Sequence, residues 1–335
     1  MLMNNYSKKV KVLIVSIIAG IFFGCLLCGC GGRVPYSKKN DKIQPDKQVL
    51  YSVKDCSGYT TEFYEIPKRI LPISNGMTAV LVDLVEPERI LAISEDNLAK
   101  GSLIKSKAEK VRDKFSGWAS TEMIIKLKPD LVIMPETSDV TKVQTLRDLG
   151  IRVVITIAPR NMEQIQERIL FVAQAVYAEN AGKRVIEKMN KKLNAIQDMK
   201  EMVKNNRKTI LAFSSQGAYG RKGGLFDNLC DVAGIVNGAA EAGLKKMDHL
   251  SQEQIIQINP DYLLLPRMNG DDTFAIETLK NPVYQGIVAV QKKQYLILEE
   301  ESYRYNVSQY AADIAYLIAD AAYHPYLRRV PVFDY

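Results

Sequence analysis

One segment of this chain occurs twice. Residues 120–136, STEMIIKLKPDLVIMPE, and residues 251–267, SQEQIIQINPDYLLLPR, align without a gap about 130 residues apart. Each copy has the pattern of a short helix that breaks before Pro-Asp and continues into an all-apolar strand. Such apolar strands are typical of parallel sheets that are buried on both faces. A chain that contains this unit twice is predicted to fold into two α/β lobes of similar plan.

The two copies also predict where each helix begins and ends. A Ser side chain accepts a hydrogen bond from a free amide of the first helical turn, so Ser120 and Ser251 are the expected N-caps. Proline cannot continue a helix and biases the preceding residue toward extended geometry, so Lys128 and Asn259 are the expected break points.

Outside the copies, strands and helices alternate, which again predicts parallel sheets. The stretch from residue 162 to about 205 is helical instead, with a break near 178–182 and a Lys-rich second part that has one apolar face. A helix of about 24 residues is about 36 Å long, so this one is the expected crossing between the lobes. The expected domains are an N-terminal α/β lobe at 50–160, a helical segment with the interlobe helix at 161–206, and a C-terminal α/β lobe at 207–335.

The N-terminus has the pattern of an export signal. Lys8, Lys9 and Lys11 precede an apolar run from residue 12 to 28, which is short for a membrane span. Residues 1–29 are therefore the predicted signal peptide. Residues 30–49 are polar, contain two prolines and lack a hydrophobic period, so they are a predicted flexible tether.

Charge, motifs and cysteines exclude several classes of protein. The net charge of +7 falls to +4 without the three N-terminal lysines, and there is no basic run, so nucleic-acid binding is not expected. Neither a phosphate loop nor a G-x-S-x-G segment occurs, so an enzyme is not expected. The clustered His and carboxylate ligands that bare zinc or manganese requires are not evident. Cys56 and Cys230 fall in different predicted lobes and are expected to be separate thiols.

Several short motifs occur in a characteristic order: Ile66-Pro67-Lys68-Arg69-Ile70, Glu122 through Pro129-Asp130, Ala233-Gly234 with Asn237, Glu253 through Pro260-Asp261, and Asn281-Pro282 to Ala289-Val290. As a set, over roughly residues 50–325, they resemble the helical-backbone (class III) substrate-binding proteins of ABC importers. The chain departs from that pattern at Val85-Glu86, where the family often has a glycine. Leu27-Cys28-Gly29-Cys30 looks like a bacterial lipobox, which implies that Cys30 is lipidated and anchors the protein outside the cytoplasm.

The resemblance implies two Rossmann-like lobes with parallel sheets, joined by one long bridging helix, with the ligand in the cleft between them. It implies capture of a ferric-siderophore-type iron complex and its delivery to an ABC permease dimer with its ATPase subunits. Heme and cobalamin remain alternatives, and a non-transport ligand-sensing lipoprotein is the alternative from another class. A monomer without a cofactor is expected. In the family, one acidic residue on each lobe meets a permease arginine, and Glu122 and Glu253 occupy the matching positions.

The candidate ligand-binding residues lie mainly at the ends of predicted strands. Ligands of open α/β sheets sit outside the carboxyl ends of strands, and three arginines there could present guanidinium groups to an anionic chelate. Four aromatic residues could supply walls. His249 and His324 do not follow a strand, so heme iron would need Tyr219 or Met268. The expected set is Asn75, Trp118, Glu136, Tyr219, Arg221, Arg267, Met268, Tyr303, Arg304 and Tyr305.

Overall fold

The protein is described by a computed structural model that covers residues 48–245 and 248–335, and residues 48 onward form one compact unit. The predicted signal peptide, Cys30 and the tether up to residue 47 lie outside the described residues. Among the described residues, none of the helices is both long enough and apolar enough to span a bilayer.

The first lobe contains a parallel sheet of three strands in the order β3-β6-β7. Its strands are short and almost completely buried, as their apolar sequences require. Two smaller pairs, antiparallel β1–β2 and parallel β4–β5, complete the strands of this lobe. The bounds are β1 Tyr51–Lys54, β2 Thr60–Phe63, β3 Ile70–Pro72, α1 Asn75–Leu81, β4 Ile93–Ser94, α2 Lys105–Ala108, β5 Lys114–Phe115, α3 Thr121–Leu127, β6 Leu131–Pro135, α4 Val140–Asp148 and β7 Val153–Thr156.

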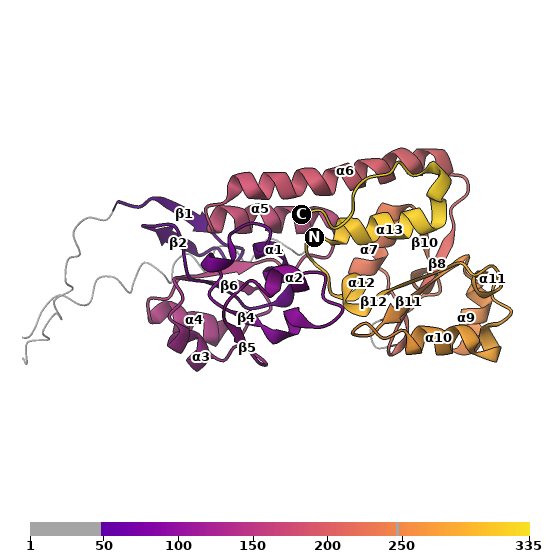
Figure 1. Ribbon diagram of the computed structural model, residues 1–335, viewed down its shortest axis with the longest axis horizontal. Helices are drawn as coiled ribbons and strands as arrows, with labels where there is room; N and C mark the ends of the chain where they lie inside the picture. The colour runs from indigo at the N-terminus through magenta and orange to yellow at the C-terminus, as the bar shows by residue number, and fades with distance from the viewer. Residues whose placement is uncertain (1–47, 246–247) are drawn as a thin grey trace, which may run out of the picture. The chain divides into compact units, whose positions relative to one another are not determined.

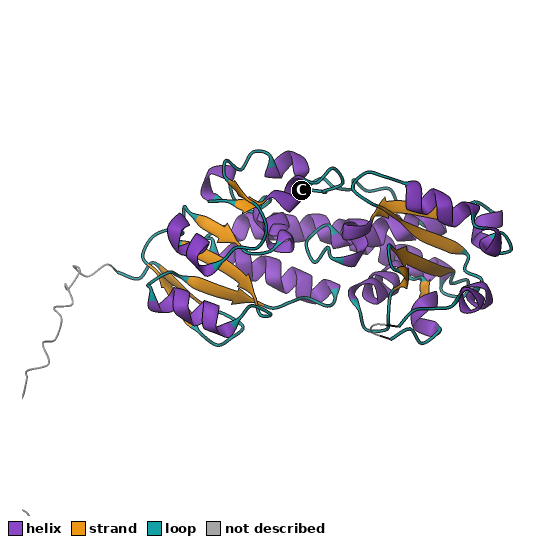
Figure 2. Ribbon diagram, turned by 90° about the horizontal axis from the view of Figure 1, so that it is seen from below, coloured by secondary structure: helices purple, strands orange, loops and turns teal. Residues whose placement is uncertain are grey.

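The second lobe contains a sheet of five strands in which β10, β8, β11 and β12 are parallel and β9 pairs antiparallel with β8. Figure 2 shows the strands of the two lobes as separate groups with helices beside each. The mixed α/β architecture with parallel sheets is the predicted fold class. The bounds are β8 Thr209–Ser214, β9 Gly217–Tyr219, α7 Leu225–Ala233, β10 Val236–Asn237, α8 Gly238–Glu241, α9 Gln252–Ile258, β11 Tyr262–Arg267, α10 Thr273–Lys280, α11 Val288–Gln291, β12 Tyr295–Glu299, α12 Glu300–Arg304 and α13 Ala311–Tyr323.

Two helices connect the lobes. α5 (Met162–Ala175) packs on the first lobe, and α6 (Glu179–Val203) has 25 residues, which corresponds to about 37 Å. α6 packs against α5 and also against α7 and α13 of the second lobe (Figure 1). The long helix α6 therefore packs directly on the second lobe and is joined to the first lobe through α5.

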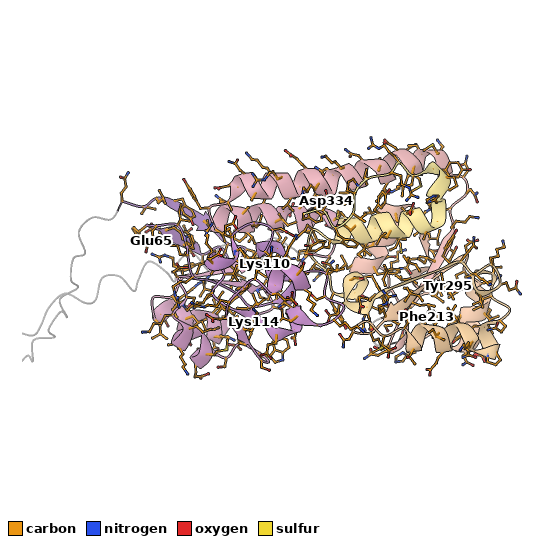
Figure 3. The ribbon with its side chains drawn as sticks, in the orientation of Figure 1. Glu65, Lys110, Lys114, Phe213, Tyr295 and Asp334 are labelled. Carbon is orange, nitrogen blue, oxygen red and sulfur yellow. The ribbon has the colours of Figure 1, made fainter. Side chains whose placement is uncertain are left out.

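The last residues of the chain pack beside α6. Lys192 of α6 is 1% exposed, and its Nζ lies 2.7 Å from Oδ1 of Asp334 and 3.4 Å from Oδ1 of Asp313 in α13. Asp334 is labelled in Figure 3. A buried lysine requires such partners because an unpaired charge in the interior is costly. This cluster fastens α6 to the second lobe.

The two copies fold alike. Ser120 accepts a hydrogen bond from the amide of Met123, and Ser251 accepts one from the amide of Gln254, so both predicted caps are confirmed. The helices end where predicted, but the expected extended geometry is wrong. Lys128 and Asn259 both adopt left-handed conformations, with φ of 51° and 42°, because each amide still closes the last helical turn.

Candidate ligand-binding groove

Three adjoining cavities form a groove that residues of both lobes line. The first, of about 170 Å³, and the second, of about 310 Å³, share Gly101, Ser102, Glu301 and Tyr305. The third, of about 370 Å³, belongs to the second lobe and shares Gln216 and Arg304 with the second cavity. We call this set of cavities the groove.

The first cavity lies where the start of α1 faces the segment around α12. Asn75 lines it from the first lobe, and Tyr305 and Asn306 line it from the second. Nδ2 of Asn97 donates to Oδ1 of Asn75 at 3.2 Å, which fixes the orientation of the Asn75 amide. Asn75 was predicted from its place after a strand. Asn97 was missed because its segment carries no clear helical or strand period.

The lobes meet closely beside this cavity. A Cβ atom at Gly101 would lie 2.0 Å from Cδ of Glu299, so a larger residue there would require the Glu299 side chain to move. Gly270 is similarly close to the side chain of Lys100. The glycine at 101 therefore permits the close approach of the two lobes at the groove.

Acidic side chains cluster along the second cavity. Glu299, Glu300 and Glu301 line it, and Asp96 lines the first cavity nearby. Loss of water contact, followed by the negative charges of Asp96, Glu299 and Glu300, raises the pKa of Glu301. This side of the groove favours cationic or protonated groups.

The predicted trio of open guanidinium groups is only partly present. Arg267 lies in the second cavity, but its Nε and Nη2 donate to the carboxylate of Asp272 at 2.6 and 3.0 Å. Arg304 is paired with Glu300 four residues earlier. Arg221 lines the third cavity and forms no ion pair within residues 48–245 and 248–335. Two of the three charges are thus compensated, because acids that follow the same strands reach them.

The third cavity combines aromatic and basic groups. The guanidinium of Arg304 lies 5.1 Å from the centre of the Tyr219 ring, a cation–π distance. Burial raises the pKa of Tyr219, so its hydroxyl stays neutral at physiological pH. His249 lines the same cavity. The strand-end rule does not identify His249, because no strand directly precedes it.

Tyr303 was predicted to line the groove, and this prediction is wrong. The segment after β12 forms the short helix α12, and the side chain of Tyr303 is completely buried. Its hydroxyl donates to the carbonyl of Phe213 at the end of β8. Figure 3 labels Phe213 within the second lobe. Tyr305, just after α12, is 60% exposed and lines two cavities.

Trp118 and Glu136 lie outside the groove. Trp118 is 93% exposed because its neighbour Ala119 takes the buried position in the loop before α3. Glu136 follows β6 as predicted, but its Oε1 accepts a hydrogen bond from the amide of Ala158. Met268, by contrast, lines the second cavity. The strand-end rule thus places Asn75, Tyr219, Arg221, Arg267, Met268, Arg304 and Tyr305 along the groove and fails for Glu136 and Tyr303. Trp118 was predicted as an aromatic wall and not by this rule.

Glu122 and Glu253 occupy equivalent exposed positions in the first turns of α3 and α9. Hydrogen bonds from its own amide and from Ser120 lower the pKa of Glu122, and a hydrogen bond from Ser251 lowers that of Glu253. Neither forms an ion pair with a described residue. The first helical turn of each copy therefore presents one carboxylate to solvent.

Known proteins share this fold. The ABC transporter substrate-binding lipoprotein YvrC of Bacillus subtilis (strain 168), itself uncharacterized, is 24% identical over 248 residues, which is 71% of this chain and 76% of YvrC. The apo heme-binding protein RhuT of Roseiflexus sp. RS-1 has a TM-score of 0.64 at 21% identity, over 77% of this chain and 98% of RhuT. The ABC-type Fe3+-hydroxamate transport system protein of Saccharomonospora viridis DSM 43017 has a TM-score of 0.59 at 16% identity, over 81% and 98%.

The sequence itself assigns the family. The profile of the periplasmic binding proteins matches residues 74–301, which include most of both lobes, the bridging helix and all of the groove residues except Ser302, Arg304, Tyr305, Asn306 and Tyr310. Proteins of this family bind ligands for transport and are not enzymes. The chain belongs to the periplasmic binding protein family.

Proposed function

We propose that this protein is the substrate-binding component of an ABC importer and captures a ferric-siderophore-type iron complex in the groove. The observation that carries the proposal is a groove lined by both lobes in a chain of this family. A ligand held by both lobes can stabilise one arrangement of the lobes, and a permease can read that arrangement. Lipidation at Cys30 would keep the loaded protein at the membrane.

The third cavity supports a metal chelate as the ligand. Tyr219 offers an aromatic face, and Arg304 and Arg221 offer donors for the oxygen atoms of hydroxamate or catecholate groups. The Fe3+-hydroxamate transport protein of Saccharomonospora viridis shares the fold. Because Arg267 and Arg304 are already paired with acids, the groove suits a chelate of low net charge better than a highly anionic one.

Heme is a second candidate, and one observation favours it. His249 and Tyr219, both of residue types that ligate heme iron, line the same cavity. RhuT of Roseiflexus, which shares the fold, binds heme. In this case Tyr219 would act through its oxygen atom rather than through its ring.

Calorimetric titration with a ferric hydroxamate siderophore, a ferric catecholate, heme and cobalamin tests the proposal. We expect micromolar or tighter binding of one ferric siderophore. The Trp118 side chain is too exposed to report on the groove, so calorimetry is preferable to Trp fluorescence. Binding of none of these ligands, or tight binding of heme alone, would contradict the siderophore assignment.

Two substitutions sharpen the result. Arg304→Ala should weaken siderophore binding about 10- to 100-fold through loss of a charge-assisted contact. Arg112→Ala, which removes another ion-paired arginine on the surface of the first lobe, is the matched control and should change nothing. Tyr219→Phe keeps the ring and removes the hydroxyl, so it should spare siderophore binding and damage heme binding.

Transport separates an importer component from a sensor. If the protein serves an importer, cells that lack it should lose uptake of the radiolabelled ferric siderophore. Uptake that persists, together with a changed transcriptional response to the siderophore, would favour the ligand-sensing alternative.

A further inference from the structure

Arg168, in the middle of α5, is a buried cation without a visible counterion. Its side chain is 4% exposed, and its Nε and Nη2 atoms are buried without a hydrogen-bond partner among the described residues. No described carboxylate forms an ion pair with it. Desolvation, unopposed by any neighbouring acid, lowers the pKa of Arg168 to about 10, so the side chain still carries its charge at neutral pH.

Arg168 is also one of the residues that line a cavity of about 240 Å³. It lies apart from the groove, between the end of β1, the end of β7 and α5. One water occupies about 30 Å³ in the liquid, so the space suffices for a small polyatomic ion. The lining residues are Lys54, Asp55, Cys56, Ile155, Thr156, Ile157, Glu167, Arg168 and Phe171.

The acids that line this cavity do not compensate Arg168. Both carboxylate oxygens of Asp55 are already engaged: Oδ1 accepts from Ser57 and Tyr59, and Oδ2 accepts from Nη2 of Arg147 and the amide of Ile155. The Asp55–Arg147 pair is closed, with a distance of 2.7 Å and a fully buried Asp55. Glu167 is exposed to solvent and makes no ion pair with a described residue. Lys54, also exposed, brings a second positive charge to the cavity.

The far side of Arg168 is closed by the lobe interface. A Cβ atom at Gly76 would lie 3.9 Å from Nη2 of Arg168 and 3.1 Å from Cγ2 of Val307 in the second lobe. Among the described residues, no acid contributes to the lowered pKa of Arg168, which desolvation alone explains. Burial of a charge without a partner is strongly unfavourable, and the guanidinium has few partners as well matched as the paired oxygen atoms of an oxyanion.

We propose that this cavity binds a small oxyanion, a phosphate or a carboxylate, which pairs with the guanidinium of Arg168. The site is distinct from the groove and does not depend on the identity of the transported ligand. Because Arg168 lies between the sheet of the first lobe and Val307 of the second, a bound anion would strengthen the first lobe next to the lobe interface.

Thermal unfolding in phosphate tests the site. The probe is inorganic phosphate, compared with sodium chloride at equal ionic strength. The unfolding midpoint of the unmodified chain should rise by at least about 2 °C in phosphate over chloride. Arg168→Met should abolish this difference, whereas Arg184→Gln, which removes an exposed arginine of α6, should keep it. A phosphate effect of equal size in Arg168→Met, or none in the unmodified chain, would overturn the proposal.

Cys56 provides a second measurement that needs no variant. It is exposed and lines the cavity, whereas Cys230 is buried. Bound phosphate should at least halve the rate at which iodoacetamide modifies Cys56, followed by mass spectrometry of its peptide. An unchanged rate at phosphate concentrations that saturate the thermal shift would place the anion elsewhere and contradict the site.

Discussion

The two copies of the repeated segment share one backbone and expose different side chains. Both have a Ser cap, a left-handed helix end and a buried strand that leads to the edge of a parallel sheet. The residue two positions before the cap is the fully exposed Trp118 in one copy and the cavity-lining His249 in the other. The strands end in Glu136, which binds a backbone amide, and in Arg267, which reaches the groove. Conserved geometry within the chain therefore coexists with divergent surfaces.

The largest expected effect concerns what the copies share. The double substitution Glu122→Ala and Glu253→Ala removes one exposed carboxylate from each lobe, and we expect it to abolish uptake while ligand affinity stays unchanged. Transport of the radiolabelled ligand and calorimetry measure the two quantities. The control is Glu163→Ala with Glu277→Ala, which removes two other exposed acids. Lost ligand affinity, or normal uptake, would refute the docking role.

The shared aspartates test whether the copies are equally important for stability. Asp130 accepts hydrogen bonds from the amides of Lys68 and Arg69 before β3, and Asp261 accepts one from the amide of Thr209 at the start of β8. Asp130→Ala should lower the free energy of unfolding by about 2–3 kcal/mol, and Asp261→Ala by about 1–2 kcal/mol. Urea denaturation measures both. Equal losses would show that the number of bonded amides does not set the cost.

Exchanging the residues at the two helix ends, Lys128 and Asn259, should have a smaller effect on stability. A left-handed conformation is costly for Lys128 and easier for Asn, so Lys128→Asn should stabilise the protein by about 0.5–1 kcal/mol. The reverse change, Asn259→Lys, should destabilise the protein by more, because Oδ1 of Asn259 also accepts a hydrogen bond from the amide of Val288. Urea denaturation again supplies the measurement. A loss of stability in Lys128→Asn would mean that the lysine makes an interaction worth more than the strain.

The smallest expected effect is the pH dependence of ligand affinity, which arises from the acidic residues that line the groove next to the second copy. The pKa of Glu301 is raised, so an anionic ligand should favour its protonated form. Affinity for such a ligand should be highest below this pKa and fall about two- to fivefold as the pH rises through it. A cationic ligand should show the opposite trend, and Glu301→Gln should flatten either curve. Calorimetry between pH 4.5 and 7.5 measures the dependence.

Much of the fold could be predicted from the sequence because each copy of the repeated segment contains residues that mark the beginning and the end of its helix. Ser caps and Pro-Asp breaks are local signals, and apolar strands and the α6 stripe are periodic ones. β9 and α12 were missed because short elements of three and five residues are stabilised by their neighbours rather than by their own propensities. Left-handed ends at Lys128 and Asn259 likewise depend on the closing amide bond of the helix.

The groove was less predictable because its residues depend on contacts between distant segments. The strand-end rule found Asn75, Arg267 and Met268. It could not reveal that Asp272 and Glu300 neutralise two arginines, since an ion pair depends on side-chain direction. Nor could it separate Tyr303 from Tyr305, because only the formation of α12 buries one and exposes the other.

α6 acts as a ruler. An α-helix of 25 residues cannot be shortened or lengthened without turning one end against the other, since each residue adds 1.5 Å and rotates the chain by about 100°. A single inserted residue would swing the second lobe around the helix axis and separate the two sides of the groove. Evolution of such a protein can therefore change loops freely, whereas the number of residues in α6 is fixed by the alignment of everything the two lobes must hold together.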